Sequence, residues 1–138
     1  MPAASTMNEQ VIEAGVSGPN GADRLITCRG QALVPMYLGP SQNLTQTWTF
    51  FVGPPLPHPQ FHRATASAFL AAFSVYVADP ALSQWHYLEF QSVEADWDDE
   101  SGQTEMRVEL AMNTGPGIYF YISKIGYSAT VLAESPAA

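Results

Sequence analysis

The sequence predicts an all-β fold, an antiparallel β-sandwich of about six to seven strands, and three observations lead to this prediction. Several segments alternate apolar and polar residues with the period of two that is typical of a half-buried strand. Clusters of Gly, Pro, Asn and Asp, which favour turns, separate these segments. Within the segments, β-branched and aromatic residues suit a pleated surface.

The length of 138 residues and the hydrophobic content of 46% predict one domain with a core that needs no disulfide. We expect residues 1–23 to form an N-terminal arm, because the first residues are small and 17–21 reads as a loop. Within this arm Val11 and Ile12 have the character of a short strand. Residues 24–134 are then a single β-rich domain.

The first strong strand is predicted over 25–38, where every second residue from Ile26 to Leu38 is apolar or small. Pro35 has no amide proton to donate to a neighbouring strand, so this strand, or its end, is expected at a sheet edge. A second strand over 44–52 places Trp48, Phe50 and Val52 on one face and threonines on the other. The proline-rich run 53–59 predicts a rigid, extended connection.

The segment 61–78 fits two structures. Phe61, Thr65, Phe69, Phe73 and Tyr76 fall on one face of a helix, and alanine favours that state. We predict a strand instead, because 73–77 has strong β character and a helix over 64–78 would have no charged face towards solvent. The alternative is an α+β fold with one helix at 61–76.

Three further strands are predicted over 85–97, 103–112 and 118–132, joined by turns at 98–102 and 113–117 into an antiparallel meander. The middle strand has the clearest alternation in the sequence. In the outer two, the apolar phase shifts by one residue near Gln91–Ser92 and near Ser123–Lys124. Because such a shift exchanges the two faces of a strand, it predicts a bulge or bend at each place.

Composition excludes several classes of function. The net charge of -8 opposes binding to a nucleic-acid backbone. No signal-peptide pattern and no long apolar run is visible, so we predict no membrane partner and leave the location open between the cytoplasm and an assembled particle. Cys28, the single cysteine, lies on the apolar face of its strand and is expected to be an inert thiol.

No motif for catalysis, metal or cofactor binding is present, so we predict a protein that is not an enzyme and carries no cofactor. The acidic turn starting at Asp96 has Ser101 and Arg107 where a helix–loop–helix calcium site needs Gly and Glu. We therefore interpret it as a solvated hairpin turn, while an irregular Ca²⁺ site stays open. His58 and His62 are four residues apart, but His58 lies in a proline run, so we predict no zinc site.

The distribution of charge favours assembly. Between Gly30 and Ala78, Arg63 is the only residue with a formal charge, whereas eight of the 13 carboxylates lie between Glu89 and Glu109. Charged residues are depleted from interface cores, and uncharged strand edges invite association. We predict an interface on the neutral strands, with candidate residues Thr47, Trp48, Thr49 and Phe51.

The predicted function is a non-enzymatic structural subunit, of virion, tail or filament type, whose partners are copies of itself or other assembly subunits. The alternative is a lectin-like, carbohydrate-binding β-sandwich module that uses Trp, Tyr and Asp side chains. The run from Arg107 to Ala133 is similar to the closing strands of H-type lectins, and it contains no motif specific to that family.

Overall fold

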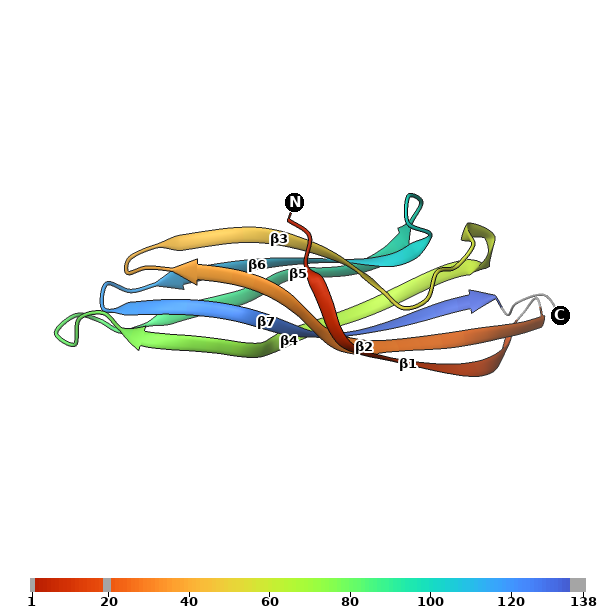
Figure 1. The fold of residues 1–138 in the computed structure, drawn as a ribbon, viewed down its shortest axis with the longest axis horizontal. Coiled ribbons are helices and arrows are strands. Elements are labelled where there is room, and N and C mark those ends of the chain that lie inside the picture. The colour runs from red at the N-terminus through yellow and green to blue at the C-terminus, as the bar shows by residue number, and fades with distance from the viewer. Residues whose placement is uncertain (1, 19–20, 135–138) are drawn as a thin grey trace.

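The computed structural model describes residues 2–18 and 21–134, which form two antiparallel sheets packed face to face in an elongated sandwich (Figure 1). The strands are β1 (Ser5–Gly18), β2 (Gly21–Leu38), β3 (Asn43–Val52), β4 (Phe61–Val77), β5 (His86–Asp98), β6 (Gln103–Thr114) and β7 (Ile118–Glu134). One short 3-10 turn, His58–Gln60, precedes β4. No helix in the described part of the chain has the length and hydrophobicity to cross a membrane.

One sheet has four strands in the order β1-β2-β7-β4, and the other has three in the order β3-β6-β5. The predicted all-β sandwich of six to seven strands is therefore confirmed. The alternative helix at 61–76 is wrong, because β4 pairs with β7 along its length. Its small residues Ala64, Ala66 and Ala68 face the core, as a strand that packs closely on another sheet requires.

The predicted meander is correct for β5 and β6, which pair across a turn with Gly102 at φ 69°, and wrong for the third strand. After β6 the chain crosses to the other sheet, where β7 pairs with β2 and β4. Both β6 and β7 have a continuous apolar face. Two such faces lose more contact with water when they pack on each other than when the strands lie side by side.

Residues 5–18, within the segment expected to be an arm, form β1, which is hydrogen-bonded along β2. From the sequence we expect a strand only at Val11–Ile12. Near its start β1 bends at Asn8, whose φ is 55°, and the chain N-terminal to the bend crosses to the other sheet (Figure 1). There the Ala4 amide donates to the Thr49 carbonyl at 2.8 Å, and the Thr49 amide donates to the Pro2 carbonyl at 3.1 Å.

Pairing of β1 with β2 ends at Leu33, so the last part of β2, including Pro35, lies at the sheet edge as predicted. The two predicted irregularities are also present. In β5 the register shifts between Phe90 and Ser92. In β7 Ser123 is skipped by the pairing with both neighbours, and the buried side chains change from even to odd positions there.

The core lies between the two sheets and is built mainly from β2, β3, β6 and β7. Its largest fully buried side chains include Tyr127, Phe120, Ile26, Met36, Met106, Leu110, Met112, Ile122 and Ile125. Cys28 is buried with them. The apolar faces predicted for 25–38, 44–52 and 103–112 all point into this core.

Replacement of Leu110 by Ala tests the facing of β6. Leu110 is fully buried, so the free energy of unfolding should fall by about 2–5 kcal/mol, from lost burial and from the cavity that remains. Urea denaturation measures this change. The neighbouring substitution Glu109→Ala, on the outer face, should cost less than about 1 kcal/mol, and equal losses for the two variants would contradict the described orientation.

Candidate functional site

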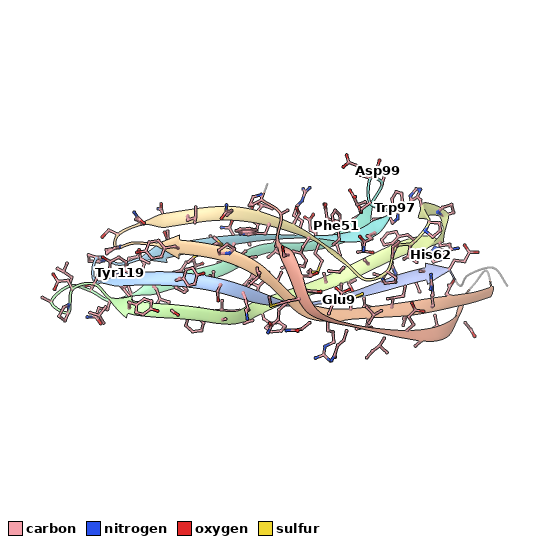
Figure 2. The ribbon with its side chains drawn as sticks, viewed as in Figure 1. Glu9, Phe51, His62, Trp97, Asp99 and Tyr119 are labelled. Carbon is pink, nitrogen blue, oxygen red and sulfur yellow. The ribbon has the colours of Figure 1, made fainter. Side chains whose placement is uncertain are left out.

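The predicted interface residues divide between the two faces of β3. Trp48 is only 6% exposed and packs in the core, because it lies on the same face of the strand as Phe50 and Val52. It is therefore not available to a partner, and its place in the predicted interface is corrected. Phe51 is 42% exposed on the outer face, where Thr47 and Thr49 also lie (Figure 2).

Part of the β3 surface already has partners within the chain. The Thr47 hydroxyl donates to the Glu109 carboxylate at 3.3 Å. The main chain of Thr49 is bonded to Pro2 and Ala4, so the edge of β3 is covered at this point. The β3 face thus offers fewer unused groups to a partner than the sequence suggests.

The three histidines are separated and each has its own neighbour. His58 stacks on Trp97 with ring centroids 4.4 Å apart, His62 lies 3.5 Å from the Asp23 carboxylate, and His86 packs edge-on against Phe120. Among the described residues, no three His, Cys, Asp or Glu side chains are grouped to hold a metal ion.

The acidic turn at the end of the β5–β6 hairpin is held by its own hydrogen bonds. Asp99 is exposed at its tip (Figure 2). Asp98 is partly buried, and its carboxylate accepts a hydrogen bond from the Ser101 amide at 2.9 Å. The connection after β3 packs beside this hairpin, where the Trp97 indole donates to the Leu56 carbonyl at 2.9 Å. These contacts assign the acidic turn a local structural role.

The outer faces of the two sheets differ in charge. On the three-stranded sheet, six carboxylates accompany one cation, Arg107. They are Glu89, Glu94, Asp96, Asp98, Glu105 and Glu109, all at outward positions of β5 and β6. The central part of the four-stranded sheet extends from the Leu25–Leu132 pair to the Tyr76–Tyr119 pair. Its described outward positions include no carboxylate and three cations, Arg29, Arg63 and Lys124.

One long side of the sandwich is closed by the N-terminal segment. Where β1 bends, Glu9 turns inward, accepts a hydrogen bond from the Gly53 amide at 2.9 Å and another from the Tyr127 hydroxyl (Figure 2). Burial raises the pKa of Tyr127 well above its usual range, and the Glu9 carboxylate adds to the effect. Glu9 therefore links β1, β7 and the connection after β3 across this side.

On the opposite long side, the two edge strands β4 and β5 lie opposite each other. Neither strand contains a buried residue, although each points apolar side chains towards the core. Phe73, Val75 and Val77 are 53%, 36% and 57% exposed, yet they pair with Ile122, Phe120 and Ile118, which are all buried on the inner face of β7. Although β5 lies opposite β4, these inward side chains stay exposed to solvent. We call Phe73, Val75 and Val77 the open apolar row.

A polar hollow of about 610 Å³ lies on the outer face of the four-stranded sheet. Its rim carries amide, guanidinium, hydroxyl and phenyl groups from all four strands, contributed by Asn8, Gln10, Thr27, Arg29, Gln31, Ser128 and Phe69. The Phe69 ring lies over Gly126, where an added Cβ would clash with the ring. Glycine at this position is therefore required for the ring to lie across β7.

The sequence alone predicts neither the open apolar row nor the hollow. The neutral character of 64–78 was visible, but the alternation does not reveal which strands lie at the edges of their sheets. The hollow joins the consecutive strands β1 and β2 to β4 and β7, which lie far from them in the sequence, so only the strand order brings its residues together. A search of protein-family models, curated proteins and solved structures found no match to this chain.

The buried thiol of Cys28 predicts a loss of stability at alkaline pH. Burial, together with the negative charges of Glu9 and Glu13, raises its pKa from 9.0 to about 11. The unfolded chain therefore ionises first, and the free energy of unfolding should fall as the pH rises from about 9 towards 11. Below about pH 9 this group has no effect.

Urea denaturation of the wild type and of Cys28→Ala at pH 7.5, 9 and 10.5 measures this contribution. Removal of the thiol changes the stability at every pH, so the slope with pH is the relevant quantity. The slope should be shallower in the variant. Equal slopes would show that Cys28 ionises as easily in the folded as in the unfolded protein.

Proposed function

We propose that this protein is a non-enzymatic structural subunit that acts through contacts with copies of itself, as part of a larger particle or filament. The open apolar row at the end of β4 is the observation that supports the proposal most strongly. Exposed apolar side chains that are continuous with a core are typical of surfaces that a partner covers.

The edge of β4 supports the same proposal. Natural edge strands avoid unwanted pairing with charged side chains, prolines, bulges or a covering segment. From Ala64 to Ala78 the chain has no charged residue and no proline, and the remaining protection is one irregularity around Ala72. A strand this long and neutral is poorly protected against association, and this supports a role in association with another chain.

Self-association is favoured over a different partner by the placement of charge. A net charge of -8 opposes close approach of two copies through the acidic face. The β4 edge has no carboxylate, so two copies meet there without contact between like charges. The acidic face stays in solvent, where it limits further, uncontrolled association.

Molar mass in solution tests the proposal. Multi-angle light scattering at micromolar concentrations should give a mass that is a multiple of the 15.0 kDa chain and depends on concentration. Replacement of Phe73 and Val77 by Lys should weaken association by tenfold or more, because buried like charges cost on the order of several kcal/mol. Circular dichroism should show an unchanged fold.

The matched control places the same charges on the predicted β3 face, as Thr47→Lys and Thr49→Lys. If the β4–β5 side is the interface, this variant should associate as the wild type does. Loss of association only in the β3 variant would move the interface to that face. A wild type that stays at 15 kDa at all concentrations would contradict the proposed function.

Carbohydrate binding is the second candidate function, and the polar hollow favours it. A hollow of about 610 Å³ falls in the usual range of ligand sites. Its amides and hydroxyls suit sugar hydroxyl groups, and the Phe69 ring, 57% exposed, offers an apolar surface to a sugar ring. The guanidinium of Arg29 selects for a sugar that carries a carboxylate.

Binding of glucuronic acid, with glucose as the neutral comparison, tests this candidate by NMR titration. Shifts for the acidic sugar should map to the hollow and be lost in Arg29→Ala and in Phe69→Ala. Arg107→Ala is the matched control, because Arg107 is the cation on the opposite outer face. Absence of shifts, or equal loss in the control, would rule out this site.

A further inference from the structure

We infer that two copies of this chain pair antiparallel along residues 73–77 of β4, with Val75 of each copy opposite Val75 of the other. The inference rests on the proposed function and specifies its contact. It would join two four-stranded sheets edge to edge into one continuous sheet of eight strands.

The main chain of β4 provides the first reason. β4 is the last strand of its sheet and, among the described residues, pairs with β7 alone, so along its other edge the amide and carbonyl groups have no strand partner in this part of the chain. Main-chain pairing at such an edge supplies regular hydrogen bonds whatever the side chains are. A second β4 is a suitable partner because its own edge has the same unused groups.

The regular part of β4 limits where the pairing begins and ends. Pairing with β7 is irregular between Leu70 and Phe73, and it is regular from Phe73 to Val77. The chain then turns, with the Asp79 carboxylate accepting a hydrogen bond from the Ala81 amide at 2.9 Å. A segment of five residues is close to the mean length of a strand, so it suffices for one pairing.

The faces of the side chains determine the register. In this segment Phe73, Val75 and Val77 point inward, whereas Ser74 and Tyr76 point outward. A two-fold axis at Val75 pairs Phe73 with Val77 and Ser74 with Tyr76, so every residue meets one from its own face. An axis between Val75 and a neighbour would pair inward with outward residues.

Neighbouring registers that keep the faces matched are less favourable. An axis at Ser74 extends the pairing into the irregular stretch around Ala72. An axis at Tyr76 places Phe73 opposite Asp79, beyond the end of the strand. Val75 is therefore the centre that uses the whole regular segment and no residue outside it.

Burial and charge agree with this register. The pairing brings together the open apolar rows of two copies, which are the inward side chains left most exposed. On the outer face Tyr76, 60% exposed, lies in the row next to Tyr119, which stacks on Tyr37 at 6.2 Å. Arg63 lies at the far end of β4, so antiparallel pairing keeps the two arginines apart.

The symmetry has a consequence for assembly. A two-fold contact uses the same surface on both copies and is complete with two of them. The charged outer faces remain outside this contact. One of them is acidic, so repulsion between these faces limits association of one completed pair with another.

Cysteine crosslinking tests the register. Residues directly opposite in an antiparallel pair have Cα atoms about 4.5–5.5 Å apart, within the range that a disulfide spans. Under mild oxidation, Val75→Cys should give a covalent dimer on a non-reducing gel. Wild-type protein should not, because Cys28 is buried and its pKa is raised to about 11.

Two further variants fix the direction of pairing. Phe73→Cys and Val77→Cys should each fail to crosslink alone, and a mixture of the two should give a covalent dimer. Circular dichroism checks that each variant folds. A dimer from Phe73→Cys alone, or none from Val75→Cys in a protein that light scattering shows to associate, would overturn the inference and leave the proposed function standing. A wild type that never associates would refute both.

Discussion

The packing of β6 on β7 is the contact on which the rest of this structure depends. These strands supply most of the fully buried side chains, among them Leu110 and Met112 from one sheet and Phe120 and Ile122 from the other. Only Gly115–Gly117 separates them, so the chain changes sheet in a very short connection. Each strand then sits inside its own sheet and recruits neighbours on both sides. Since one recruits three further strands in its sheet and the other two, the sheets cannot cover each other completely.

The strand left without a counterpart in the other sheet is β1, and the two long sides of the sandwich are built differently. On one side the N-terminal segment crosses from β2 to β3, and Glu9 accepts hydrogen bonds from Tyr127 and the Gly53 amide. A carboxylate so placed is partly buried, and its hydrogen bonds offset the loss of water. The other side, between β4 and β5, has no comparable segment among the described residues. The apolar row at the end of β4 stays exposed there although β5 lies opposite the strand.

Much of the fold was readable from the sequence, because period-two alternation depends only on which face a side chain occupies. It correctly assigned Ile26, Phe50 and Leu110 to the core and located the bulges near Ser92 and Ser123. Strand order is different, since it depends on which strands bury each other in three dimensions. For that reason the predicted meander is wrong for β7, and Trp48, which the alternation places correctly on the apolar face of its strand, is buried and does not fit the predicted interface.

The dependence on strand order also explains why the sequence predicts the candidate interface on β3, whereas the structure favours β4. Arg63 of β4 is the only charged residue in the two strands, and composition alone does not separate them. The neighbours of the two strands distinguish them. The β3 edge is hydrogen-bonded at Thr49 to the N-terminal segment, whereas β4 pairs with β7 only among the described residues. An uncharged strand is costly at an edge because it promotes aggregation. This chain nevertheless has a nearly uncharged strand at an edge, while its net charge of -8 is carried largely by the other sheet. Both features are accounted for if a second copy covers the edge and the charge keeps that pair soluble.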